Sequence, residues 1–275
     1  MNNPQRNRIP FVYLAAGISS RFGGKIKALA PVGPQGEPLL SVSMDQAISA
    51  GFGSFILIAS PATLQPLQDT FGDEYKGKPV GYSLQDTPAY RKKPWGTAHA
   101  LLTVRTLITG PFGLGSSDDL FGSQTYKILY EALSKGEMCI PAYQLRKALP
   151  PKGVGNRAIL ERSGDTLTRI AEHFNIGIGD IPHKYTGTEP AAMLIYGLHS
   201  SLFEPLREAF DEFMRTHPED PSTEMLLPNV INDLIAKNTI NINVITTADT
   251  PLSLTFPEDE ENVRAALAHR SHSKK

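Results

Sequence analysis

The sequence predicts an α/β protein with an open, twisted, mostly parallel β-sheet flanked by helices. Along the first half of the chain, short apolar runs alternate with segments whose apolar residues recur at helical spacing. The apolar runs are continuous, which is typical of parallel strands that are covered on both faces. Repeated β-α-β units of this kind build an open parallel sheet.

The first half supplies most of the predicted sheet. We expect strands at residues 11–15, 54–59, 80–84, 112–117 and 138–143, and helices at residues 39–50, 64–71, 96–108 and 126–133. Gly51 directly follows the first of these helices. It fits a C-cap, because glycine adopts the left-handed conformation without a steric penalty.

The second half is less regular. Ser163-Gly164-Asp165 predicts a hairpin turn, and residues 177–190, rich in Gly, Pro and Thr, predict a loop. We expect further strands at residues 191–198 and 240–245, and helices at 202–214 and 224–235, the second capped by Ser222 or Thr223. Pro257 marks the start of a terminal helix, and residues 269–275 form a polar tail.

Composition limits the classes of function. The 275 residues are enough for one large α/β domain, and 20% charged residues fit a soluble globular protein. A formal net charge of −1 gives no sign of a polyanion-binding surface, so we expect no nucleic-acid partner. The single cysteine, Cys139, excludes an intrachain disulfide and a cysteine-cluster metal site, and it fits a reducing compartment.

The N-terminal region superficially resembles a signal peptide, because Arg6 and Arg8 precede an apolar stretch at residues 9–18. That stretch contains Pro10 and runs directly into a cationic loop, so a buried first strand explains it better. No apolar run in the sequence approaches the roughly 20 residues of a membrane span. We therefore expect a cytoplasmic protein with no membrane partner.

The loop after the first strand is the first candidate for ligand binding. Residues 14–29 include small residues, and successive backbone N–H groups in such a turn form an anion-binding nest. Arg21 and Lys27 add positive charge, so we expect a triphosphate; the alternative is a surface turn with incidental cations. Gly17 and Gly23 are one residue too far apart for a P-loop, and the dinucleotide fingerprint Gly-x-Gly-x-x-Gly is absent.

Two adjacent acids, Asp118 and Asp119, follow a predicted inner strand. Acids at the carboxyl end of a parallel strand lie over the ligand crevice of such a sheet. A carboxylate there suits Mg²⁺, which prefers few protein oxygens together with phosphate oxygens. The alternative is an Asp pair that caps the following turn.

A third candidate is the helix start at Gly96 and Thr97, where small residues bring the backbone close to a flat ring or a phosphate. Upstream, Gln85 ends a strand, and its side-chain amide can read the edge of a nucleobase. The alternative is a helix N-terminus packed tightly on the sheet. We interpret Trp95 as a packing anchor and Arg91-Lys92-Lys93 as a solvated cationic loop.

In this order, the motifs resemble those of the sugar-phosphate nucleotidyltransferases, the family of the glucose-1-phosphate thymidylyl- and uridylyltransferases. That family opens with a strand, then Leu-Ala-Ala-Gly-x-x-x-Arg, a loop and Lys-x-Leu-x-Pro-Val. The matching residues here are Leu14, Ala15, Ala16, Gly17, Arg21, Lys27, Leu29, Pro31 and Val32. The family's strand Gln, its Gly-Thr-Ala helix start and its Asp motif match Gln85, residues 96–98 and Asp118.

The resemblance implies a Rossmann-like, glycosyltransferase-A-type fold with a central, mostly parallel mixed sheet. It also implies a single nucleotidyltransferase domain over residues 1–268, with a nucleotide-binding half at about 8–145 and an acceptor-binding half at about 150–256. An NTP and a phosphorylated small molecule are the implied partners, and Mg²⁺ is the implied cofactor. Whether the chain forms a homo-oligomer stays open.

Roles for individual residues follow from the same resemblance. Arg21 and Lys27 neutralise the α-phosphate and the leaving pyrophosphate, Asp118 binds Mg²⁺, and Glu172 contacts the sugar of the acceptor. The nucleotide-binding residues are Leu14, Ala15, Ala16, Gly17, Gln85, Gly96 and Thr97. The reaction is an in-line attack without a covalent intermediate, so positioning and charge stabilisation supply the catalysis.

The acceptor-binding half departs from the family pattern. The residue after Glu172 is His173 rather than Lys. The family usually has a second metal-binding Asp shortly before a helix start like that at Pro257, whereas residues 253–256 contain no acid here. Asp249 is the nearest upstream carboxylate and could substitute for it as a metal ligand. We expect an NTP and a sugar 1-phosphate to give an NDP-sugar and pyrophosphate. The alternatives are a cytidylyltransferase acting on a phosphorylated alcohol such as phosphocholine, and a nucleotide- or sugar-nucleotide-binding regulator. The base stays open, because the Gln85 amide fits uracil, thymine or cytosine.

Overall fold

The parallel strands predicted for the first half are present and lie side by side. The computed structural model describes residues 8–18, 22–150, 153–254 and 257–272. The strands β1 (Pro10–Leu14), β2 (Ser54–Ala59), β4 (Lys78–Leu84) and β5 (Pro111–Ser116) run parallel in the order β5-β1-β2-β4, and β3 (Glu74–Tyr75) pairs with β4 at the edge.

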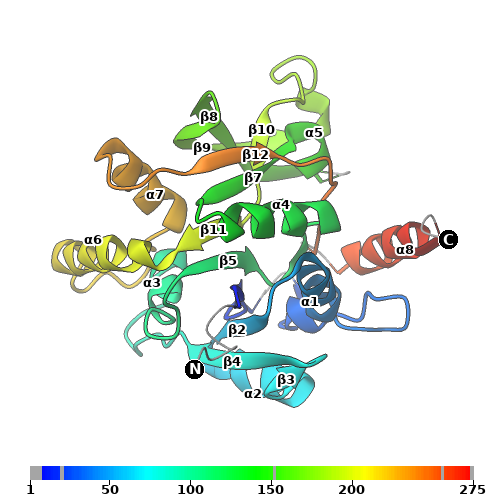
Figure 1. Ribbon diagram of the computed structural model, residues 1–275, viewed down its shortest axis with the longest axis horizontal. Coiled ribbons are helices and arrows are strands. Elements are labelled where there is room, and N and C mark those ends of the chain that lie inside the picture. The colour runs from blue at the N-terminus through cyan, green and yellow to red at the C-terminus, as the bar shows by residue number, and fades with distance from the viewer. Residues whose placement is uncertain (1–7, 19–21, 151–152, 255–256, 273–275) are drawn as a thin grey trace.

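The second half extends this sheet to eleven strands. The added strands are β7 (Cys139–Gln144), β8 (Val154–Ser163), β9 (Thr166–Gly177), β10 (Pro190–Ala192), β11 (Ile195–His199) and β12 (Asn243–Thr246). The order is β10-β8-β9-β12-β7-β11-β5-β1-β2-β4-β3, and β10 also pairs with β7 (Figure 1). Because β11 runs antiparallel between β5 and β7, the sheet is mixed. A small separate sheet joins β6 (Asp119–Leu120) to β13 (Leu252–Ser253).

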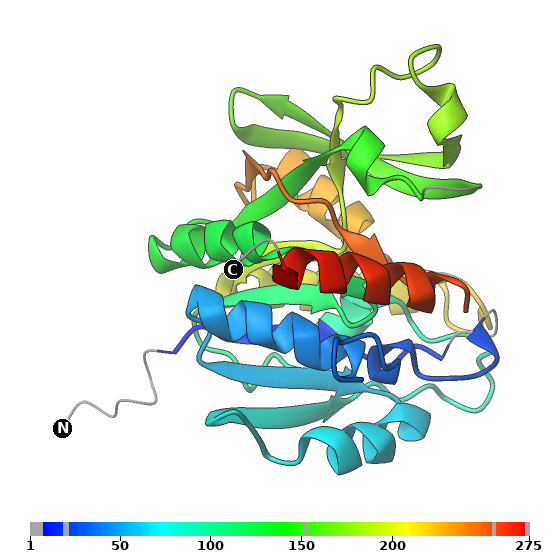
Figure 2. The same cartoon turned by 90° about the vertical axis from the view of Figure 1, so that its right-hand side faces the viewer.

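Helices cover both faces of the sheet (Figures 1 and 2). One face carries α1 (Leu39–Ala50), α2 (Pro61–Phe71), α4 (Ser123–Ser134) and α5 (Leu145–Ala148); the other carries α3 (Thr97–Leu102), α6 (Phe203–Thr216) and α7 (Leu227–Ala236). The helix α8 (Asp259–His272) lies beside α1, where Val263 and Leu267 join Leu39 in a small third core. Short 3-10 helices are η2 (Lys27–Leu29), η3 (Ile178–Asp180) and η4 (Ser200–Leu202).

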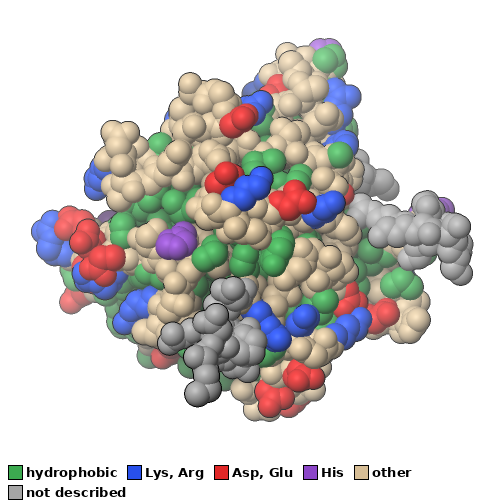
Figure 3. Space-filling model, in the orientation of Figure 1, with side chains coloured by type: hydrophobic (Ala, Val, Ile, Leu, Met, Phe, Trp, Pro, Cys, Tyr) green, Lys and Arg blue, Asp and Glu red, His purple; other side chains and the backbone are tan. Residues whose placement is uncertain are grey.

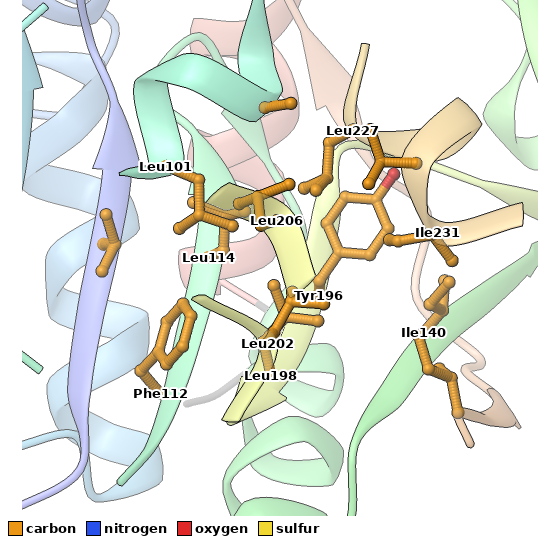
Figure 4. Close-up of a cluster of buried hydrophobic side chains, with 14 of the residues drawn as sticks. Leu101, Phe112, Leu114, Ile140, Tyr196, Leu198, Leu202, Leu206, Leu227 and Ile231 are labelled. Carbon is orange, nitrogen blue, oxygen red and sulfur yellow. The ribbon is translucent and has the colours of Figure 1, made fainter. Parts of the chain in front are cut away.

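The continuous apolar run of β1 serves two hydrophobic cores. Phe11 and Tyr13 are fully buried on the side of α1 and α4, whereas Val12 is fully buried on the side of α3, α6 and α7. Burying each such side chain stabilises the fold by about 1.5–3 kcal/mol. In the second core, side chains from helices and strands converge, as Figure 4 shows for Leu101, Phe112, Leu114, Ile140, Tyr196, Leu198, Leu202, Leu206, Leu227 and Ile231.

Two turns confirm the glycine predictions. Gly51 follows α1 with φ 117° in the left-handed region, as expected of a C-cap. The predicted hairpin joins β8 to β9, and Gly164 in its turn has φ 58°. Both positions favour glycine, because other residues rarely adopt positive φ.

Several element boundaries differ from the predictions. The helix expected at residues 96–108 ends at Leu102 and is followed by turns at residues 103–107; the Ser83 hydroxyl donates to the Thr103 carbonyl (3.0 Å). The strand expected at 191–198 divides into β10, which pairs with β7 and β8, and β11, which pairs with β5. The terminal helix begins at Asp259, two residues after Pro257, and continues to His272 through part of the expected tail.

The start predicted for α7 was wrong. The helix begins at Leu227 rather than at residue 224, and neither Ser222 nor Thr223 caps it. Instead, Met225 is held in an extended pairing in which its N–H donates to the Trp95 carbonyl (2.8 Å). Ser222 and Thr223 donate their N–H groups to the Asp220 carboxylate, which places them in a separate turn.

Charged side chains of both signs lie on the surface (Figure 3). On the face drawn in Figure 3, Lys and Arg side chains are interspersed with Asp and Glu. Across the part of the chain that the structure describes, no helix combines the length and the apolar character that crossing a membrane requires.

Candidate active site

The first and second predicted ligand loops meet at one edge of the sheet. Leu14 at the end of β1 lies in register with Ser116 at the end of β5, and the Ser117 N–H donates to the Leu14 carbonyl (3.3 Å). From η2, the Lys27 Nζ donates to Oδ2 of Asp118 at 3.2 Å. The predicted cation and the predicted metal ligand therefore form an ion pair.

A cleft of about 150 Å³ opens beside this ion pair. Its lining comprises Leu14, Gly17, Ile18, Lys27, Ala28, Ser117 and Asp118. Among the described residues, no atom beyond its chain neighbours lies within 4 Å of a Cβ atom added at Gly17, so these residues leave the space beside this backbone open to a ligand. Ala15 differs, because it is buried and its N–H already donates to the Ile58 carbonyl (2.8 Å). Arg21 lies outside the described residues.

A second cleft of about 270 Å³ shares Lys27 and Asp118 with the first. Its other lining residues are Asp119, Asn156, Arg157, Ala158, Glu172, Ala192, Met193, Leu194, Tyr196, Pro228, Ser253 and Leu254. Glu172 reaches this cleft from β9, where it lies opposite Ala158 of β8. The structure thus brings the residue expected to contact the acceptor into the same cleft as the expected metal ligand.

The two adjacent acids have different environments. The Asp118 side chain is 38% exposed, whereas Asp119 lies deeper and accepts a short hydrogen bond from the Ser116 hydroxyl. Burial, with the neighbouring Asp118 charge as a second cause, raises the pKa of Asp119 to about 6. Of these two acids, Asp118 is the one that lines both clefts, whereas Asp119 lines the larger cleft.

The donor set at this edge fits Mg²⁺. Asp118 supplies carboxylate oxygens, which are hard ligands, and Asp119 adds a second carboxyl group beside it. Within the described ranges, no cluster of three or more His, Cys, Asp or Glu side chains is placed to hold a metal ion. Mg²⁺ is commonly held by one or two carboxylates, with water and substrate phosphates completing its shell, so a larger cluster is not required.

Asp249 has a different role from the metal ligand considered above. Its Oδ2 accepts hydrogen bonds from the Thr125 N–H (2.8 Å) and the Thr125 hydroxyl (3.1 Å), which caps the N-terminus of α4. A Cβ atom at Gly122 would lie 2.3 Å from the Asp249 Cγ, so glycine is needed for this close fit. Ser253, by contrast, pairs with Asp119 across β13 and β6 and lines the larger cleft.

The third predicted group, Gln85, Gly96 and Thr97, comes together but is engaged with the protein itself. The buried Gln85 donates its Nε2 to the Gly96 carbonyl (3.0 Å), and the Thr97 hydroxyl accepts from the Leu227 N–H (2.9 Å). Gly96 has φ 101°, and a Cβ atom there would lie 2.4 Å from the Met225 carbonyl oxygen. These contacts dock α3 on α7; contact with a nucleotide stays a prediction for these three residues.

The prediction for Arg91 was wrong, because its side chain is buried rather than solvated. Its guanidinium donates to the carbonyls of Lys93, Pro94, Asp220 and Thr223 and lies 3.7 Å from the centroid of the Trp95 ring. Trp95 itself is buried, as expected of a packing anchor.

Sequence reasoning also missed Arg157, which lines the larger cleft. The signal that could have identified Arg157 is its position on β8, the strand paired with β9, which carries Glu172.

Comparison with curated proteins gives a uridylyltransferase that is similar to part of this chain. The UTP–glucose-1-phosphate uridylyltransferase AglF of Haloferax volcanii is 31% identical over 116 residues, which cover 41% of this chain and 44% of the relative. The match thus spans less than half the length of that curated relative.

Solved structures share the fold. A UDP-glucose pyrophosphorylase complexed with UDP-glucose has a TM-score of 0.67 at 16% identity and covers 96% of this chain and 99% of its own. The inositol-1-phosphate CTP transferase from T. maritima has a TM-score of 0.66 at 14% identity and covers 95% of each chain. The architecture is therefore the Rossmann-like fold of nucleotidyltransferases, as the sequence motifs implied.

The strongest assignment comes from the sequence profile of a family. Residues 11–162, more than half of the chain, match the MobA-like NTP transferase domain. This segment contains β1, β5 and both members of the Lys27–Asp118 pair. The chain belongs to the MobA-like NTP transferase family and is a nucleotidyltransferase.

Proposed function

We propose that this nucleotidyltransferase joins an NTP to a sugar 1-phosphate, giving an NDP-sugar and pyrophosphate. One observation carries the proposal: two clefts, one beside Gly17 and one beside Glu172, meet at the Lys27–Asp118 pair. A reaction that joins two phosphorylated substrates needs two adjoining sites with charged groups at their junction.

In this proposal the NTP occupies the smaller cleft and the acceptor occupies the larger one. The open backbone at Gly17 lets the triphosphate approach β1 closely. Glu172 accepts hydrogen bonds from sugar hydroxyl groups, which orients the acceptor. The α-phosphorus then lies near Lys27, where the two clefts join.

The chemistry is a displacement at the α-phosphorus. A phosphate oxygen of the acceptor forms the new bond, the bond to the β-phosphate bridging oxygen breaks, and pyrophosphate leaves with that electron pair. The attacking phosphate oxygen is already ionised at neutral pH, so no general base is needed. Lys27, whose side chain is 17% exposed, stabilises negative charge in a partly desolvated site, where a cation acts more strongly than in water.

Asp118 would hold Mg²⁺, with Asp119 beside it. When bound, the ion neutralises charge on the phosphate oxygens. The protein groups themselves orient the substrates, and the ion pair between Lys27 and Asp118 keeps both side chains at the junction before the substrates arrive.

UTP and glucose 1-phosphate are the first pair to test. They are the substrates named for the uridylyltransferase AglF, which is similar to this chain over 116 residues. The test measures pyrophosphate release with Mg²⁺, crossing the four ribo-NTPs and dTTP with a panel of sugar 1-phosphates and phosphocholine. We expect one sugar 1-phosphate pair to react, and Lys27→Ala and Asp118→Ala to abolish the signal.

Two results would contradict the proposal in different ways. Turnover of CTP with phosphocholine alone would move the chain to the cytidylyltransferases that act on phosphorylated alcohols. Binding of an NTP without turnover of any pair would favour a nucleotide-binding regulator.

A further inference from the structure

Arg157 is the second cation of the larger cleft. Of the described residues that line this cleft, only Lys27 and Arg157 carry a permanent positive charge. Arg157 lies on β8 directly opposite His173 of β9.

The His173 side chain contacts Tyr185. Its Nδ1 lies 3.0 Å from the Tyr185 hydroxyl, and the two rings pack edge to face with centroids 5.7 Å apart. This contact ties β9 to the loop that follows it. His173 is therefore held against Tyr185, and it is not among the described residues that line the larger cleft.

The Arg157 guanidinium is fixed by neutral acceptors. Its Nε donates to the Ala148 carbonyl (2.6 Å) and its Nη1 to the Asn156 carbonyl (2.7 Å). Over the described ranges of the chain, no carboxylate oxygen lies within 4 Å of it. An arginine has five N–H donors, so these two contacts leave three for a ligand. The side chain is oriented while its charge has no ion-pair partner.

Arg157 supplies positive charge beside the acids of the cleft. Asp118, Asp119 and Glu172 contribute carboxyl groups, and the charge of Lys27 is already paired with Asp118. Burial lowers the pKa of Arg157, and the charge of the nearby Asp119 carboxylate opposes this shift. An arginine stays protonated at any physiological pH. It is thus the unpaired cation available to an incoming anion.

We propose that Arg157 binds the phosphate of the acceptor and holds it for attack at the α-phosphorus. This inference rests on the proposed function, because it assigns a residue to the acceptor side of the same site. The planar fork of a guanidinium matches two phosphate oxygens, so it fixes the orientation of the phosphate as well as its charge. The ligand chemistry is a phosphate monoester, which a sugar 1-phosphate and a phosphorylated alcohol share.

Kinetics on four variants test the assignment. Arg157→Gln removes the charge, Arg157→Lys keeps the charge without the fork, and the double variant Arg157→Gln/His173→Lys returns a cation from the opposite strand. The matched control is Arg162→Gln, because Arg162 lies on the same strand but is ion-paired with Asp165 at the hairpin turn. Thermal unfolding of each variant shows whether it is folded.

We expect Arg157→Gln to raise the KM for the acceptor by about 10- to 100-fold, as the loss of a charge-assisted hydrogen bond would do. The KM for the NTP should stay within about twofold, which a general loss of structure would not produce. Arg157→Lys should lie in between, and the double variant should regain part of the lost affinity. An acceptor KM for Arg157→Gln equal to that of Arg162→Gln would overturn the inference.

Calorimetry separates this inference from the proposed function. Glucose 1-phosphate and phosphocholine are titrated separately into each folded variant in the presence of a non-hydrolysable NTP analogue. If no pair turns over, the proposed function fails, yet weaker binding of either phosphate monoester to Arg157→Gln than to the wild-type chain still supports Arg157. The two titrations also show which kind of phosphate monoester the cleft accepts. Equal binding to both chains, or no binding to the wild-type chain, contradicts the role of Arg157.

Discussion

Nζ of Lys27 lies 3.2 Å from Oδ2 of Asp118, although 91 residues separate them in the sequence. The pair joins the loop after β1 to the end of β5, at the junction of two clefts. Both side chains are only partly exposed, at 17% and 38%. In the proposed reaction, each group exchanges this partner for a phosphate oxygen or a metal ion, so the pair prepares the site before the substrates bind.

The cap on α4 gives a first prediction. We expect Asp249→Ala to lower the free energy of unfolding by about 1 kcal/mol, because the Thr125 N–H and hydroxyl lose their acceptor. Asp249→Asn should lose less, since its amide keeps an acceptor oxygen. Urea unfolding followed by circular dichroism measures both values. Equal losses in the two variants would mean that the carboxylate charge, and not the cap, stabilises the helix.

The close contact at Gly96 gives a second prediction. Gly96→Ala adds a Cβ atom 2.4 Å from the Met225 carbonyl oxygen at a residue with φ 101°. Gly136→Ala is the matched control, because Gly136 has φ 77° but, among the described residues beyond its chain neighbours, no atom within 4 Å of the added Cβ. We expect the control to lose about 1 kcal/mol from backbone strain and Gly96→Ala to lose clearly more. Thermal unfolding that ranks them the other way would contradict the α3–α7 contact.

His99 gives a prediction about pH. Burial, assisted by the charge of Arg91, lowers the pKa of His99 below its usual value of 6.5. The unfolded chain therefore takes up this proton at a higher pH than the folded chain does. The neutral ring, which stacks on Phe210 with centroids 4.9 Å apart, contributes stability above about pH 6.5 that is lost as the pH falls.

Urea unfolding at several pH values tests this sign. Between about pH 7 and pH 5, the wild-type chain should lose more stability than His99→Gln, which has no titratable ring. His183→Gln is the control, because His183 is exposed. A pH dependence of His99→Gln that matches the wild-type chain would show that His99 does not carry the effect.

The part of the candidate site around Lys27 and Asp118 was largely predictable, because its signals are local. The strand β2 matches the expected residues 54–59, and β1 and β5 lie within one residue of their expected positions. Once these strands are parallel, the loops that follow them emerge at the same edge. The approach of Lys27 to Asp118 therefore follows from the order of the motifs.

The remaining features depend on contacts between distant segments. From the sequence, Arg91 is predicted to be solvated. In the structure its guanidinium donates to the carbonyl of Asp220, which lies 129 residues away in the sequence. Asp249 could have been a metal ligand by position, but the N-terminus of α4 supplies it with donors. Likewise, the start of α7 is set by the pairing of Met225 with Trp95 and not by the polar residues before it.

The central claim is that the reaction takes place where Lys27 meets Asp118. The most direct test is steady-state pyrophosphate release by the wild-type chain, Lys27→Met and Asp118→Asn, with Lys25→Ala as a control in the same loop, where Lys25 is exposed. We expect kcat to fall about 10²- to 10³-fold in the first two variants, the loss typical of removing one group that stabilises the transition state, and to be unchanged in the third. Activity of Lys27→Met and Asp118→Asn within about threefold of the wild-type chain would contradict the account.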